Sequence, residues 1–136
     1  MKETDAAYIA GIIDGEGSIL LTKLSRNTHR APVVSVPSTT IELLEYLKET
    51  IGHGKITRKT NYNKEKHKDC FTYILERNQA IDLLKEVSQY LIIHSKKKRA
   101  NLILSKYKDL TPRNGRYTEA MLLEKEEFYK EFASYK

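Results

Sequence analysis

Residues 8–18 read YIAGIIDGEGS. It begins as an apolar helix built from small residues and ends in a turn where acids alternate with glycines. Asp14 and Glu16 stand two positions apart, and each is followed by a glycine. A carboxylate at the end of a buried apolar run is costly unless a cation meets it. The stretch therefore predicts a site for a cation, which for a carboxylate oxygen is typically Mg²⁺.

The totals of the chain limit the class of protein. Its 136 residues are enough for one domain, which we expect to span residues 1–136. Lys and Arg number 24 against 18 Asp and Glu, and the net charge of +6 is as compatible with a nucleic-acid partner as with solubility alone. The single cysteine excludes an internal disulfide, and the start MKETD has no signal-peptide core. We expect an intracellular protein, in the cytoplasm or an organelle, that is neither secreted nor membrane-spanning.

Patterns beyond the first helix alternate between hairpins and helices. Strands are expected at 18–23 and 32–36, and again at 55–61 and 69–75, with a polar loop inside each pair. Helix starts are expected at a capping box of Thr39 with Glu42, at Asn78, at Ser95 and at Thr118. This order of elements predicts an α+β fold in which a four-stranded antiparallel sheet carries helices on one face.

The stretch at 9–17, IAGIIDGEG, resembles the LAGLIDADG signature of homing endonucleases. The differences are Ile for Leu at positions 9 and 12, Gly for Ala at 15 and Glu for Asp at 16. The order of hairpins and helices is also similar to that family, so the resemblance covers nearly the whole chain. It implies an αββαββα core with extra C-terminal helices, in which the sheet forms a DNA-binding saddle.

The resemblance also implies an assembly and a metal site. One motif per chain implies a homodimer in which the first helix packs against its mate, and small residues on one helix face allow that approach. Glu16 and the backbone carbonyl of Gly15 would bind Mg²⁺, with Mn²⁺ as a substitute. Asp14 would support the helix end by hydrogen bonds. The expected dimer interface is Ala6, Ala7, Ala10, Gly11 and Asp14.

A catalytic lysine is the second implied component. The family places a lysine on the segment entering a late helix, and residues 96–102, KKKRANL, resemble that segment. Lys96, four residues before Ala100, is the best match, and Lys98 is the alternative. A lysine there would order the attacking water or stabilise phosphate charge. The sequence departs from the family at the junction after the second strand. Many relatives have a glutamine or asparagine there, which orders active-site water, but residues 36–39 of this chain read VPST. Ser35 or Ser38 is the expected substitute.

The sheet is expected to read DNA in the major groove, where all four base pairs are distinguishable. The helix-facing positions are expected to be Ile19, Leu21, Val34, Phe71, Tyr73 and Leu75. The DNA-facing positions are expected to be Thr22, Arg26, His29, Arg30, Val33, Ser35, Lys55, Thr57, Lys59, Asn61, Lys68, Cys70 and Thr72. Five further cations are expected to touch phosphate: Arg58, Lys64, Lys66, Arg113 and Arg116.

The resemblance therefore implies a Mg²⁺-dependent enzyme of intron mobility that hydrolyses both strands of double-stranded DNA at a long, nearly palindromic site and leaves short 3′ overhangs. Two alternatives share the fold. One is a maturase that binds intron RNA, and the other is a DNA-binding protein that does not cleave. The presence of both Glu16 and Lys96 argues against the inert forms.

Overall fold

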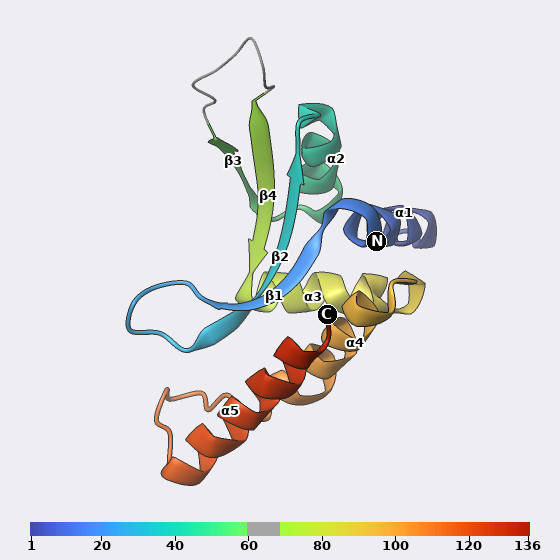
Figure 1. Ribbon diagram of the computed structural model, residues 1–136. Helices are drawn as coiled ribbons and strands as arrows, with labels where there is room; N and C mark the ends of the chain where they lie inside the picture. Colours follow the sequence, from blue (N-terminus) through green and yellow to red (C-terminus); the bar gives the residue numbers. More distant parts are fainter. Residues whose placement is uncertain (60–68) are drawn as a thin grey trace.

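The computed structural model describes residues 1–59 and 69–136, and Figure 1 shows how its elements are arranged. The core elements in chain order are α1 (Glu3–Glu16), β1 (Ser18–Lys23), β2 (Arg30–Ser38), α2 (Ile41–Ile51), β3 (Lys55–Lys59), β4 (Cys70–Glu76) and α3 (Arg77–Val87). The C-terminal elements are η1 (Ser88–Tyr90), α4 (His94–Leu102), the π-helical η2 (Ile103–Tyr107) and α5 (Glu119–Ser134). The predicted αββαββα core with extra C-terminal helices is confirmed.

The four strands form one antiparallel sheet in the order β1-β2-β4-β3, and α1, α2 and α3 lie on the same side of it (Figure 1). Side chains alternate between the two faces of a strand. The register places the six predicted helix-facing residues together on the covered face, and it adds Ile56 and Arg58 to them. The opposite face carries no helix in Figure 1, and we call it the open face.

Two prolines, Pro32 and Pro37, occupy β2, which runs past the end of the strand expected at 32–36. Pro32 pairs only with β1, because pairing with β4 begins at Val33. Pro37 pairs only with β4, because pairing with β1 ends at Ser35. Proline is tolerated where one side of a strand needs no ladder hydrogen bond. Both prolines therefore sit where β2 has a single neighbour, and the strand runs through them.

The junction between α1 and β1 requires a glycine for steric reasons. Ile9 and Ile13 of α1 are fully buried, which ties this helix to the core. A side chain at Gly17 would bring its Cβ to 2.9 Å from the Cα of Ile13 and 3.3 Å from Val36. The chain can therefore turn directly from helix into strand, and Glu16 is held at the edge of the sheet.

The predicted helix caps are correct at one of four positions. Thr118 caps α5, and its hydroxyl accepts the N–H of Met121 at 3.2 Å. The other three helices begin after Thr40, Glu76 and Ile93, and none of these has a side-chain cap. The capping box predicted at Thr39 is replaced by a turn in which the hydroxyl of Ser38 accepts the N–H of Thr40. No described helix is long and apolar enough to cross a membrane.

Candidate active site and nucleic-acid interface

Asp14, in the last turn of α1, fastens the segment that leads into α4. Its two carboxylate oxygens accept the backbone N–H groups of Ile92 at 2.9 Å and Ile93 at 3.2 Å. A carboxylate that accepts two backbone N–H groups makes charge-assisted hydrogen bonds, which are stronger than neutral ones. Asp14 thus has the supporting geometry expected of it, although its bonds reach across to another segment rather than only to its own helix end.

Lys96, in the first turn of α4, completes the same junction from the other side. Its ammonium donates to the backbone carbonyls of Ile13 at 2.8 Å and Asp14 at 2.7 Å. The last carbonyls of a helix lack partners within the helix and carry partial negative charge, so a cation there is stabilising. The cationic start of α4 therefore contacts the carbonyl end of α1. The Lys96 ammonium lies against the carbonyls that immediately precede Gly15 and Glu16.

Glu16 differs from Asp14 because its side chain is exposed, as is the neighbouring Gly15. The described residues contain no group of three or more His, Cys, Asp or Glu side chains that could hold a metal ion. Mg²⁺ in phosphoryl-transfer sites is commonly held by one or two carboxylates with substrate phosphates and waters. The exposed carboxylate of Glu16 and the Gly15 carbonyl are donors of the right type, but they make only part of such a shell.

Lys98, the alternative catalytic lysine, is directed elsewhere. Its ammonium lies 5.3 Å from the centre of the Tyr135 ring, near the C-terminus. Of the two candidate lysines, Lys96 is the one that donates hydrogen bonds to the end of α1.

Of the two serines considered for ordering water, Ser35 lies on the open face and pairs with Ser18, which follows the turn directly. Ser38 is engaged with Thr40 instead.

The faces of α1 require a correction to the expected dimer interface. Ala6 and Ala10 are 2% and 0% exposed, because they pack inside the chain's own core. They are therefore not available to a second chain. Ala7 and Gly11 are exposed as expected. With Asp14 at its edge, the exposed stripe of α1 consists of Thr4, Ala7, Tyr8, Gly11 and Gly15.

No packing contact among the described residues requires a glycine at position 11. A glycine in a helix interior costs about 0.5–1 kcal/mol relative to alanine. A Cβ built at Gly11 meets no atom within 4 Å among the described residues. The same holds at Gly15, whereas Gly17 is required by its neighbours. The packing of the described residues therefore gives no reason for a glycine at position 11.

The open face of the sheet collects most of the strand residues predicted to face DNA. The register places eight of them there: Thr22, Val33, Ser35, Lys55, Thr57, Lys59, Cys70 and Thr72. Arg26 and His29 are exposed on the loop between β1 and β2, and Arg113 and Arg116 are exposed on the loop before α5. Four further predicted contacts, Asn61, Lys64, Lys66 and Lys68, lie outside the described residues.

Two predicted DNA contacts are placed on the other face of the sheet. Arg30 points to the covered face, where its guanidinium lies 3.6 Å from the centre of the Tyr129 ring and 3.7 Å from the carboxylate of Glu126. Arg58 also belongs to the covered face and pairs with Asp69. Val33 is on the open face as predicted, but it is only 5% exposed, so its side chain has little surface to offer to a base.

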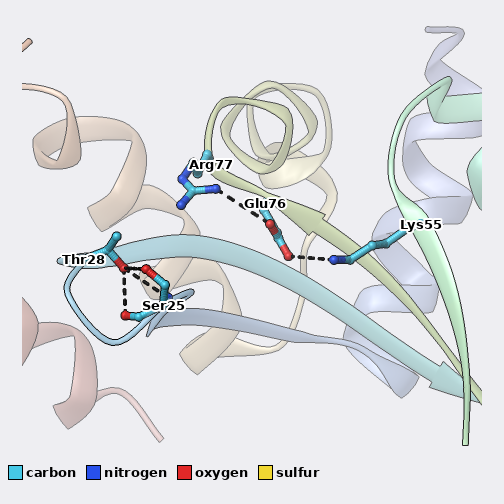
Figure 2. Close-up of polar contacts among 5 residues, drawn as sticks. All are labelled: Ser25, Thr28, Lys55, Glu76 and Arg77. Atoms are coloured by element: carbon cyan, nitrogen blue, oxygen red, sulfur yellow. Dashed lines mark hydrogen bonds and ion pairs between the residues drawn. The ribbon is translucent and has the colours of Figure 1, made fainter.

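The sequence interpretation missed Glu76, which lies on the open face, and Arg77, which begins α3 and reaches Glu76. Figure 2 shows them in a row with Lys55: the Lys55 ammonium lies 3.5 Å from Glu76, and the Arg77 guanidinium lies 3.9 Å from it. Arg77 has φ of 55°, an unfavourable value for a residue with a side chain. The signal available in the sequence was the alternation of Cys70, Thr72 and Ile74, which continues to Glu76. The expected strand ended at residue 75 and the expected helix began at Asn78, so Glu76 and Arg77 were assigned to neither element.

Several solved structures that are similar to this chain are homing endonucleases. The homing endonuclease I-CvuI, in complex with the I-CreI target in the presence of Mg, aligns with a TM-score of 0.77 and 19% identity, over 98% of this chain and 83% of that one. The archaeal intron-encoded homing endonuclease I-Vdi141I, complexed with DNA, aligns with a TM-score of 0.66 and 19% identity, over 100% and 86%. I-GzeII, in complex with a DNA target, aligns with a TM-score of 0.69 and 16% identity, over 96% of this chain but 44% of that one. At such identities the likeness shows the fold.

Proteins with curated descriptions include no match to this chain. The family model described as LAGLIDADG endonuclease matches residues 9–119, which covers most of the sequence and begins at the acidic motif. The arrangement of Asp14, Lys96 and Glu16 lies within that match. The chain therefore belongs to the LAGLIDADG endonuclease family.

Proposed function

We propose that this chain is one subunit of a homodimeric, divalent-metal-dependent homing endonuclease that cuts both strands of a long, nearly palindromic DNA site. The observation that carries the proposal is the acidic turn at the end of α1. There, Asp14 and Lys96 form the hydrogen bonds that hold the turn, while Glu16 is exposed two residues before Ser18, the first open-face residue of β1. An enzyme site of this kind needs a rigid support and a free ligand, and the turn supplies both.

Glu16 and the Gly15 carbonyl would hold Mg²⁺ or Mn²⁺ in this proposal. When bound, the ion supplies Lewis-acid stabilisation of phosphate charge. The chain's own residues then have separate tasks. Lys96 fixes the position of the turn and adds a positive charge beside it. Ser35, on the open face near Ser18, is the residue proposed to order water.

The second subunit is proposed to pack on the exposed stripe of α1. Two helices approach closely only where small side chains meet, and Ala7 and Gly11 provide this. The absence of any contact for a Cβ at Gly11 within the described chain supports a role in assembly. Packing of α1 against its mate would bring two copies of Glu16 together, with one cutting site for each strand. Short 3′ overhangs are part of the proposal and follow from cleavage across the minor groove.

The open face is proposed as the DNA-reading surface. Its hydroxyl and cationic groups stand at alternate positions along the strands, where side chains could reach base edges in the major groove. Glu76 adds a carboxylate that can accept from a cytosine amino group, and Lys55 and Arg77 neutralise it until then. A dimer carries a formal charge of +12, twice +6, so binding should weaken steeply with salt.

The test is a selection from a randomised duplex library, performed in Mg²⁺ and again in Ca²⁺. Sequence-specific cutting of both strands in Mg²⁺, lost in Glu16→Gln while binding persists, supports the nuclease. Binding without cutting in either ion supports a DNA-binding protein and contradicts the proposal. A parallel measurement with structured intron RNA covers the maturase, for which tight RNA binding without DNA cleavage would be the result.

A further inference from the structure

The outer end of the β1–β2 hairpin projects beyond the rest of the sheet. Pairing between β2 and β4 ends at Val33 with Glu76, whereas pairing between β1 and β2 continues to Lys23 with Arg30. The hairpin is thus a two-stranded ribbon beyond Val33, and such a ribbon is only marginally stable without further packing. In Figure 1 it curves away from β4, and α5 runs beneath it.

The C-terminal segment supplies the missing support at the tip. The Arg30 guanidinium stacks on Tyr129 of α5 at 3.6 Å from the ring centre, and Glu126 pairs with it at 3.7 Å. On the neighbouring residue, the His29 ring lies 4.2 Å from the Tyr117 ring, which belongs to the loop before α5. Two aromatic residues therefore hold two consecutive residues of the hairpin.

These aromatic residues are themselves anchored. The buried ammonium of Lys125 donates to the Tyr117 hydroxyl at 2.6 Å and to the Thr111 hydroxyl at 3.0 Å, which fixes the loop on α5. At the other end of α5, Arg99 donates to the carbonyls of Tyr135 at 2.7 Å and Ile19 at 3.0 Å. The helix is thus linked to the hairpin both at its tip and near its base.

The distance along the hairpin indicates which bases depend on this support. Five residue steps separate Ser18, beside the acidic turn, from Lys23, which is about 17 Å along an antiparallel strand. At about 3.4 Å per base pair, the tip lies about five base pairs further from the cutting position than the base of the hairpin. The turn itself is closed by Ser25 and Thr28, as Figure 2 shows.

We infer that Tyr117 and Tyr129 are positioning residues for DNA specificity. They contact the hairpin from the covered side, and they set where Thr22, Arg26 and His29 stand over the outer base pairs of each half-site. This inference rests on the proposed function, because it concerns the DNA that the open face would read. It assigns a recognition role to the C-terminal segment without any base contact of its own.

The experiment measures cleavage by wild type and variants over a library in which each base pair of the selected site is replaced in turn. Tyr129→Leu should relax discrimination at the outer positions by about fivefold or more, the lower end of what one mismatched pair normally costs. Discrimination at the inner positions should be unchanged. Tyr129→Phe keeps the ring beneath Arg30 and should keep the wild-type profile.

Two further variants separate positioning from stability. Tyr90→Leu removes a half-buried tyrosine from η1 rather than from beneath the hairpin, and it should leave the profile unchanged whatever it does to the melting temperature. Glu126→Lys, at an exposed position, should fold and should repel Arg30, so the outer positions should relax as in Tyr129→Leu. An unchanged outer profile in folded Glu126→Lys and Tyr129→Leu, or equal relaxation at all positions, overturns the inference. A wild type without sequence-specific cleavage overturns the proposed function itself and the inference with it.

Discussion

One face of α1 is buried against α3, β2 and η1, whereas the opposite face, which carries Ala7 and Gly11, is exposed. On the buried side, the last turn of α1 is held by Lys96, which bonds the carbonyls of Ile13 and Asp14, and by Asp14, which bonds the segment before α4. On the exposed side, a Cβ at Gly11 would meet no described atom within 4 Å, and the helix ends at the exposed Glu16. The chain therefore supports the acidic turn by itself, and in the proposed dimer a second copy would supply the remaining metal ligands.

The largest effect is expected from replacing the acid at the exposed end of α1. Glu16→Gln should lower the cleavage rate by about 10²–10³-fold or more, the range for loss of one preorganised electrostatic group. Its free energy of unfolding should be unchanged, because the side chain is exposed. Single-turnover cleavage and denaturant titration measure the two effects. Glu3→Gln, on the exposed start of the same helix, is the matched control and should cut normally.

Lys96 and Lys98 provide the next comparison. Lys96→Met removes two charge-assisted hydrogen bonds to α1, so the free energy of unfolding should fall by about 1.5–3 kcal/mol. Lys98→Met removes one cation–ring contact and should cost at most about 0.5–1 kcal/mol. Urea titration of both variants gives the values. Equal losses would contradict the claim that Lys96 holds the acidic turn.

Asp14→Asn should lower stability less than Lys96→Met does. Unlike Glu16→Gln, it should affect folding more than cleavage. The amide keeps one acceptor oxygen for the N–H groups of Ile92 and Ile93, so the free energy of unfolding should fall by about 1–2 kcal/mol. Cleavage should decline less than in Glu16→Gln. If Asp14→Asn instead abolished cutting at unchanged stability, Asp14 would be a ligand and the division between the two acids would be wrong.

Gly11→Ala should have the smallest effect on folding and should act in opposite directions on folding and assembly. The folded chain has room for the methyl group, so the free energy of unfolding should rise by about 0.5–1 kcal/mol at dilutions where the chain is monomeric. The dissociation constant of the dimer should rise as well. Gly17→Ala is the counterpart, and it should destabilise because its Cβ would lie 2.9 Å from Ile13.

Much of the fold was predictable because its signals are local. Alternation along residues 69–75 and the apolar helix before Asp14 identify their elements directly. The contents of the site were partly predictable: the motif pointed to Glu16, and spacing from Ala100 selected Lys96. Neither signal reveals that Asp14 and Lys96 meet across the α1–α4 junction, because that pairing depends on tertiary packing.

The errors also have physical causes. Ala6 and Ala10 were assigned to the dimer because a pattern of small residues does not tell which face the chain buries. Arg30 was assigned to DNA because a cation in a strand looks the same on either face of the sheet. Its actual partners, Tyr129 and Glu126, are almost a hundred residues away in sequence. Only the register decides such cases, and one residue of shift reverses the face.

The central claim is that the exposed stripe of α1 completes the site by packing on a second copy. Sedimentation equilibrium of the wild type and of Gly11→Leu, with Glu45→Leu on α2 as an exposed control, tests it most directly. We predict a wild-type and a control dimer, and a folded Gly11→Leu monomer that has lost double-strand cutting. A wild type that remains monomeric while cutting both strands, or a Gly11→Leu dimer with full activity, would contradict the claim.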